Sequence, residues 1–168
     1  GQYIAVSHDD QDLTAGDGTS GIYIWGAQLE QSSTVGEYVK TTSTINSAPR
    51  FDHEVTRTTT NLALYSEEFD NTAEWGTTNA SVGSNVAIAP DGTLTADKVI
   101  EDTNTGEHRV TDGVTITQGA PYTYSVYAKA AERSFFHIYI FHASGNVGRA
   151  YFNLVDGSLV SESGQVTA

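Results

Sequence analysis

Hydrophobic and polar side chains alternate along most of the chain, so that every second side chain is hydrophobic. A period of two is typical of β-strands, because successive side chains of a strand point to opposite faces. The segments with this pattern are residues 2–7, 21–29, 84–89, 96–100, 108–116, 121–129, 134–142 and 149–155. Gly, Asn, Asp and Thr, which favour turns, separate them. No segment shows a convincing helical pattern; the one weak candidate is residues 66–75, where Ser66 precedes acidic residues that suit a first helical turn.

Many short strands between turns predict an all-β protein in which two sheets pack face to face. In residues 134–142, however, both faces of the expected strand are hydrophobic. One face is formed by Phe136, Ile138 and Ile140, and the second by Phe135, His137, Tyr139 and Phe141. The first face suits the core between the sheets, whereas the second should be polar if it were solvated. A second packed layer, a partner or a ligand is therefore expected on the second face.

The pattern is interrupted in residues 41–60, which are polar, rich in Thr and contain Pro49. We interpret this stretch as an exposed linker. It separates residues 1–40, with the terminal strands of one module, from residues 61–168, with the first strands of a module. The shorter part holds two or three strands and is too small to be stable alone. It is therefore expected to pack on the longer part or on a neighbouring copy.

Composition excludes several classes of function. The 168 residues suffice for one domain with its own core. With 21 acidic and 8 basic residues, the net charge of −13 disfavours binding to nucleic acids and to anionic membranes. No apolar run approaches the roughly 18 residues of a membrane span, and the first residues do not resemble a signal peptide. The lack of Cys excludes disulfides and thiolate chemistry, and the lack of Met leads us to expect a processed chain or a piece of a longer one.

Three motifs resemble one family of domains. Residues 61–75 (NLALYSEEFDNTAEW) are similar to the opening of galactose-binding-like jelly-roll carbohydrate-binding modules. Residues 119–132 (GAPYTYSVYAKAAE) resemble their mid-domain strand, and residues 21–30 (GIYIWGAQLE) resemble their last strand. Together with residues 47–54 (SAPRFDHE), the WGAQLE motif is most similar to the version in tail fibres and other virion proteins of bacteriophages. The resemblance implies a jelly-roll β-sandwich, glycan binding and a location in a virion or outside the cell.

The order of these motifs differs from that of the family, because the family's last strands come first here. The resemblance therefore implies either one permuted sandwich or a split one, completed by neighbouring repeats or by a homo-oligomer. It also implies a structural calcium ion held partly by Asp70 or Glu68. However, Trp25 and Gly26 stand where the family's last strand often has paired acids.

A glycan site is expected on the second face of residues 134–142. Aromatic rings stack on the apolar faces of sugars, and hydroxyl, amide and imidazole groups bind sugar hydroxyls. The candidate ligand-binding residues on this and neighbouring strands are Tyr127, Lys129, His137, Tyr139, Phe141, Arg149, Tyr151 and Asn153. The alternatives are cross-strand packing and an interface with another chain. Trp25 lies in a dense apolar segment and is expected in the core.

An acidic loop near the start of the chain suggests a calcium site. Its candidate metal ligands are Asp9, Asp10, Asp12 and Asp17. Calcium binds roughly six to eight oxygen atoms, which carboxylates and backbone carbonyls of such a loop can supply. The spacing is not that of an EF-hand, because no Glu closes a loop of about twelve residues. The alternative is a solvated acidic loop.

We therefore expect a non-catalytic carbohydrate-binding module that recognises a glycan through the ring face around Tyr139. The first alternative is a structural subunit of a fibre or virion, assembled through the same face or through an open sheet edge. The second alternative is an accessory domain of a glycan-processing enzyme. Catalysis itself is not expected, because no carboxylate pair, nucleophile motif or zinc-ligand spacing is apparent.

Overall fold

The computed structural model describes residues 2–7, 15–49, 58–117, 119–142 and 147–164. Within these residues the protein is all-β and contains no helix. The strands pair in an antiparallel manner and form three separate sheets. The prediction of an all-β fold is therefore confirmed.

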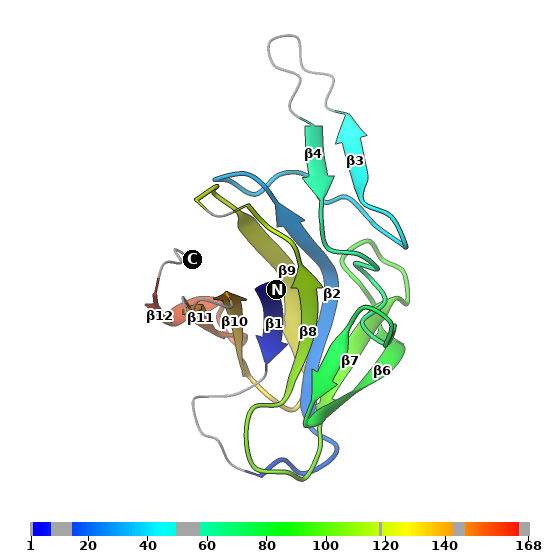
Figure 1. The fold of residues 1–168 in the computed structure, drawn as a ribbon. Coiled ribbons are helices and arrows are strands. Elements are labelled where there is room, and N and C mark those ends of the chain that lie inside the picture. Colours follow the sequence, from blue (N-terminus) through cyan, green and yellow to red (C-terminus); the bar gives the residue numbers. More distant parts are fainter. Residues whose placement is uncertain (1, 8–14, 50–57, 118, 143–146, 165–168) are drawn as a thin grey trace.

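A six-stranded sheet and a four-stranded sheet make up most of the protein (Figure 1). The larger sheet has the order β12 (Ser158–Ser163), β11 (Val147–Asn153), β10 (Phe135–His142), β1 (Gln2–Ser7), β8 (Arg109–Val114), β5 (Gly76–Thr78). The smaller sheet has the order β6 (Ala80–Ala87), β7 (Ala96–Glu101), β2 (Gly21–Glu30), β9 (Thr123–Ala130). A third sheet consists of β3 (Asn46–Pro49) and β4 (Thr58–Asn61).

One hydrophobic cluster joins the two larger sheets. Its buried members are Ile22, Ile24, Ala27, Leu29, Ala63, Phe69, Trp75, Val99, Val110 and Phe136. They come from β2 and β7 of the smaller sheet, from β8 and β10 of the larger one, and from the segment after β4. Phe136 is thus buried in this core and Ile138 packs against it, as the alternation in β10 predicts.

Strands from the beginning of the chain lie between strands from its later part. β1 pairs with β10 and β8, and β2 pairs with β7 and β9. Residues before the expected linker and residues after it therefore share both large sheets.

The buried side chain of Asn61 connects β2 to the segment that follows β4. Its amide nitrogen donates to the carbonyl oxygens of Ala27 at 2.9 Å and Val39 at 2.8 Å. Its oxygen accepts from the backbone N–H groups of Leu29 at 3.1 Å and Ala63 at 3.0 Å. One amide thus satisfies four backbone groups that would otherwise be buried without partners. Asn61 is the first residue of the NLALY motif, and its bonds to Ala27 and Leu29 hold this motif against the WGAQLE motif. Both motifs therefore have a structural role.

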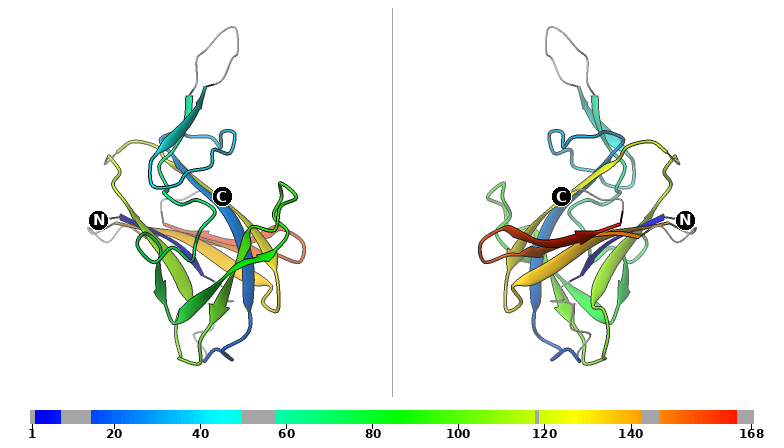
Figure 2. Two further views of the ribbon diagram at one scale, coloured as in Figure 1. Left: turned by 90° about the vertical axis from the view of Figure 1, so that its right-hand side faces the viewer. Right: turned by 90° about the vertical axis from the view of Figure 1, so that its left-hand side faces the viewer.

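Two segments between β2 and β5 have local structure that the alternation did not predict. The stretch expected to be a linker contains β3 and β4, whose hairpin projects away from the larger sheets (Figures 1 and 2). Residues 66–75 form successive turns instead of a helix, with backbone bonds from Glu68 to Tyr65 and from Asn71 to Glu68. A helix would place Phe69 and Trp75, six residues apart, on different faces. In these turns both rings enter the core, with their centroids 4.6 Å apart.

Candidate functional site

The ring face of β10 is largely closed. His137 and Tyr139 lie on the face opposite to Phe136, but they are only 2% and 5% exposed. The expectation of an exposed ring face is therefore wrong for these two residues. The backbone of Phe141 pairs with Tyr3, while its side chain lies outside the described residues.

Arginine side chains account for the burial of Tyr139. The guanidinium carbons of Arg109 and Arg149 lie over its ring, 5.7 Å and 5.2 Å from the ring centre. Both arginines form ion pairs with Glu107. Burial raises the pKa of the Tyr139 hydroxyl. We use the name arginine–tyrosine cluster for Arg109, Arg149, Glu107, Tyr139, His137 and Tyr151.

The remaining candidates on β11 also have intramolecular roles. The ring of Tyr151 lies 4.8 Å from that of His137, measured between centroids. The side-chain oxygen of Asn153 accepts a hydrogen bond from the backbone of Val155 at 2.9 Å, in the turn that leads to β12. Asn153 thus stabilises a turn at the end of β11.

Tyr127 and Lys129 do not belong to the ring face of β10. They lie on β9, which pairs with β2 in the smaller sheet. In this pairing Tyr127 is opposite Trp25, and Lys129 is opposite Tyr23. The expectation that all eight candidates form one patch is therefore wrong, because β9 and β10 belong to different sheets.

Tyr127 and Lys129 instead line a groove on the outer face of the smaller sheet. The groove has a volume of about 250 Å³ and is mainly apolar. We call it the aromatic groove; its lining residues are Tyr23, Ile24, Trp25, Ala87, Ile88, Ala89, Pro90, Ala96, Tyr127, Ala128 and Lys129. It combines three aromatic side chains with one ammonium group.

Trp25 is a rigid part of this groove. It is 5% exposed, as expected for a buried residue, but it packs with Ala89 and Ala96 in a small cluster separate from the main core. Its indole N–H donates to the Thr95 hydroxyl at 3.1 Å. The ring of Tyr38 lies against it, with centroids 4.7 Å apart. The indole is therefore held both by packing and by a hydrogen bond.

Tyr38 is itself fixed from the other side. Its hydroxyl lies 2.8 Å from the Ser66 hydroxyl and donates to Glu67 at 3.1 Å. Burial raises the pKa of this hydroxyl, so Tyr38 stays neutral at ordinary pH. The Tyr38 ring that packs against Trp25 therefore adds no charge to the groove.

Gly26 allows these rings to approach the backbone. The pairing of β2 with β9 shifts after Trp25, and Gly26 adopts a φ of 65°, which favours glycine. A Cβ atom at this position would lie 3.2 Å from the Tyr38 ring and 3.4 Å from the Tyr127 ring. The Gly in the WGAQLE motif therefore shapes the groove.

Tyr127 provides the accessible ring of the groove. Its side chain is 50% exposed, and its ring centroid lies 5.5 Å from that of Trp25. Lys129 is also exposed. An exposed ring on a rigid aromatic support can stack on an apolar ligand face, while hydroxyl and ammonium groups bind polar atoms.

Tyr23 and Ile88 also line the groove, although the sequence did not predict them to be ligand-binding residues. The period of two places Tyr23 and Trp25 on one face of β2, so the signal was present in the sequence. The position of Tyr23 and Trp25 in one groove with Tyr127 depends on the pairing of β2 with β9, across about a hundred residues of sequence, which alternation alone does not predict.

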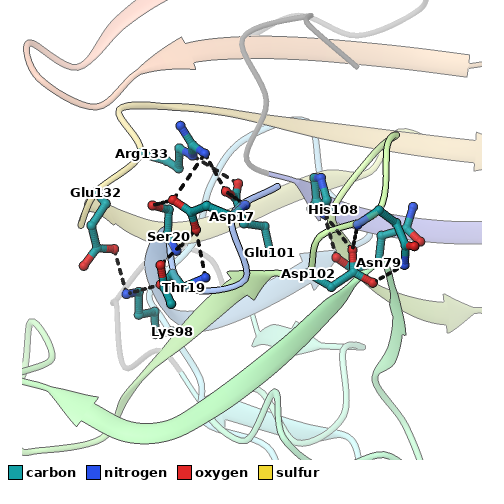
Figure 3. Close-up of polar contacts among 11 residues, drawn as sticks. Asp17, Thr19, Ser20, Asn79, Lys98, Glu101, Asp102, His108, Glu132 and Arg133 are labelled. Atoms are coloured by element: carbon teal, nitrogen blue, oxygen red, sulfur yellow. Dashed lines mark hydrogen bonds and ion pairs between the residues drawn. The ribbon is translucent and has the colours of Figure 1, made fainter. Parts of the chain in front are cut away.

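Only Asp17 of the candidate calcium ligands belongs to the described residues; Asp9, Asp10 and Asp12 lie outside them. The carboxylate of Asp17 accepts hydrogen bonds from Thr19 and Ser20 (Figure 3). Its Oδ2 atom lies 3.8 Å from the Nη2 atom of Arg133. The bonds to Ser20 make the largest contribution to holding its pKa well below the ordinary value. Arg133 also pairs with the buried Glu101. Both oxygens of Asp17 thus already stabilise a turn, which does not fit a free metal ligand.

The other acids implied by the family resemblance do not form a metal cluster either. Glu68 and Asp70 are exposed, and no group of three or more His, Cys, Asp or Glu residues suited to a metal occurs in the described part of the chain. The carboxylate of Asp97 instead accepts from the backbone N–H of Phe69 at 2.8 Å. Calcium binding therefore stays a prediction for the acidic loop.

A second polar group in Figure 3 surrounds His108. Its Nδ1 lies 2.6 Å from the carbonyl oxygen of Asn79, which also accepts from the backbone N–H of Asp102. His108 is buried, and the contacts join the turn before β8 to the start of β6. We assign these contacts a structural role.

Comparison with known proteins identifies no relative of this chain. The described residues contain no helix that could cross a membrane. Neither a protein-family model, nor a curated protein, nor a solved structure matches the chain.

Proposed function

We propose that this protein is a non-catalytic carbohydrate-binding module that holds a glycan in the aromatic groove. The observation that carries the proposal is the half-exposed Tyr127 ring, supported by the buried Trp25 in an open groove. A sugar ring has an apolar face that stacks on such a platform and hydroxyl groups that bind polar atoms around it.

The rigidity of the platform favours binding. Trp25 is fixed by Thr95 and Tyr38, so little side-chain freedom is lost when a ligand covers it. Tyr127 has two rotatable side-chain bonds and rests against Trp25, which also limits the entropic cost of its ordering. The groove therefore needs little rearrangement before a sugar binds.

The arginine–tyrosine cluster is a weaker candidate for the same function. Tyr139 is buried beneath two guanidinium groups, and both of these form ion pairs with Glu107. A sugar would have to displace these contacts before it reached the ring. The ligand site is accordingly proposed on the smaller sheet.

We further propose that the fold is a permuted jelly-roll sandwich of the galactose-binding-like type, from a phage virion or another extracellular assembly. Two features support this assignment. Both large sheets contribute to one hydrophobic core, and β1 and β2 insert between later strands. The WGAQLE and NLALY motifs are joined by Asn61, as a permuted module requires.

The test is glycan binding by the Tyr127→Ala variant. A glycan array with the wild-type chain identifies a retained glycan, and titration calorimetry with that glycan then compares variants. Loss of the stacking ring should weaken affinity about tenfold. Because Tyr127 is half exposed, the unfolding free energy should change by less than about 1 kcal/mol.

The matched control is Phe135→Ala, which removes an exposed ring from β10, on the other sheet. It should leave the glycan affinity unchanged. Equal affinities of the wild type and Tyr127→Ala, or an array on which the wild type retains no glycan, would contradict the proposed function.

A structural role is the second candidate, and the edge of the larger sheet favours it. Among the described strands, β12 is the outermost strand of that sheet, and Leu159 and Val160 on it are exposed. An apolar edge strand can pair with another chain. Light scattering distinguishes the two functions: ordered multimers with a silent array support assembly, and a monomer that retains glycans supports binding.

A further inference from the structure

We propose that the glycan in the aromatic groove carries a carboxylate, so that the ligand contains a hexuronic acid unit bound through Lys129. This inference rests on the proposed function and names the class of sugar. It is carried by the distribution of ion pairs over the protein.

Among the lysines and arginines of the described part of the chain, almost all form an ion pair with an acid. The ion pairs are Lys40 with Glu67, Lys98 with Glu132, Arg109 with Glu107, Arg133 with Glu101, and Arg149 with Glu107. Within the same residues, Lys129 is the exception. In a chain with a net charge of −13, a cation without an acidic partner is unusual.

The position of Lys129 places this charge at the groove. Tyr23 lies between two lysines in the sheet, opposite Lys98 on β7 and opposite Lys129 on β9. Lys98 binds Glu132 at 2.6 Å and the carbonyl oxygen of Thr19 at 3.0 Å. Lys98 is thus engaged, whereas the Lys129 ammonium is available to a ligand beside Tyr127.

Electrostatics favours an anion at this point. The many carboxylates of the protein repel an acidic ligand from most of the surface, so a local cation gives orientation as well as affinity. The mainly apolar groove excludes part of the solvent, which strengthens a charge-assisted hydrogen bond from Lys129 to a carboxylate.

The size of the groove suits one sugar unit. Its volume of about 250 Å³ equals roughly eight water molecules. One pyranose ring with a carboxylate fills such a space, and the rest of the polysaccharide then lies outside it. Stacking on Tyr127 holds the ring, and Lys129 binds the carboxylate.

The experiment measures binding of trigalacturonic acid and of its methyl ester, which keeps the rings but removes the charges. The wild-type chain should bind the acid about tenfold more tightly than the ester. The Lys129→Gln variant should bind acid and ester equally. The Lys40→Gln variant changes the net charge by the same amount at a half-exposed lysine that does not line the groove, and it should keep the preference.

The outcomes separate this inference from the proposed function. Equal binding of acid and ester by the wild type overturns the inference, as does a preference that survives in Lys129→Gln. If neutral glycans are nevertheless retained and lost in Tyr127→Ala, the proposed function stands alone. If no sugar is bound, both are overturned.

Discussion

The two large sheets each carry aromatic and basic side chains on their outer faces, but they use them differently. In the arginine–tyrosine cluster, Tyr139 is covered by Arg109 and Arg149, and both arginines form ion pairs with Glu107. In the aromatic groove, Tyr127 remains half exposed. The ring of the first region is closed off by contacts within the chain, whereas the ring of the second is accessible.

This difference shows why residue type alone does not identify a binding site. Rings and cations that stack on one another stabilise the fold through contacts of about 0.5–1 kcal/mol or more each. The same groups bind a ligand only where their faces and charges stay available. The distinction depends on neighbours from other strands, and three tests of it follow.

The largest effect is expected for Tyr139→Ala. Removal of this buried ring leaves a cavity beneath the two guanidinium groups and should lower the unfolding free energy by about 3 kcal/mol. Urea unfolding followed by tryptophan fluorescence measures the change. Glycan affinity of the folded fraction should be unchanged, because the groove lies on the other sheet.

Tyr127→Ala is the natural counterpart of this variant, with a small effect on stability and a large effect on binding. If Tyr139→Ala proved neutral for stability but abolished glycan retention, the assignment of the two regions would have to be exchanged.

An intermediate effect is expected from pH, because each sheet also buries an aspartate. Burial raises the pKa of Asp97 on β7 to about 6, even though its carboxylate accepts from Phe69 and Asn85. Burial, with repulsion from Glu74, raises the pKa of Asp112 on β8 from 3.8 to about 7. The native state therefore binds these protons more tightly than the unfolded state does.

The stabilisation from these protons is complete below about pH 4 and is lost as the pH rises through 6 and 7. Between pH 5 and 7, Asp112 alone should lower the unfolding free energy by about 2 kcal/mol. Urea unfolding at pH 5, 6 and 7 measures the slope, and Asp112→Asn should flatten it. A wild-type stability that is constant or rises over this range would contradict the prediction.

Alternation along the chain predicted the strands with buried faces well. β2, β7, β8, β9 and β10 lie close to their expected positions. β3, β4, β5 and β12 were not predicted, because they are short or mostly exposed and rich in Thr, Ser and Gly. Such strands carry few hydrophobic side chains on either face, so the alternation that marks a strand is missing.

The candidate site was predicted only in part, for a related reason. Alternation correctly placed His137 and Tyr139 on one face of β10 and Tyr127 and Lys129 on one face of β9. It could not assign the two strands to different sheets, nor place Arg109 over Tyr139. Both facts depend on pairing between distant segments, which a period of two does not encode.

A smaller effect on stability than that of Tyr139→Ala or of pH is expected for Gly26→Ala. The positive φ of Gly26 should cost about 1 kcal/mol of unfolding free energy for any residue with a Cβ atom. The added methyl group would also press on the rings of Tyr38 and Tyr127, so glycan affinity should fall about as much as in Tyr127→Ala. The arginine–tyrosine cluster, on the other sheet, should not be affected.

Gly92→Ala is the matched control, because Gly92 has a similar φ of 86° but nothing within 4 Å of its Cβ position. It should show the same loss of stability with no loss of affinity. Calorimetric titration of both variants with the same glycan separates backbone strain from displacement of the rings. If Gly26→Ala bound the glycan as tightly as Gly92→Ala does, the packing of Tyr38 and Tyr127 around Gly26 would not be what shapes the site, and the contrast between an open and a closed ring surface would rest on exposure alone.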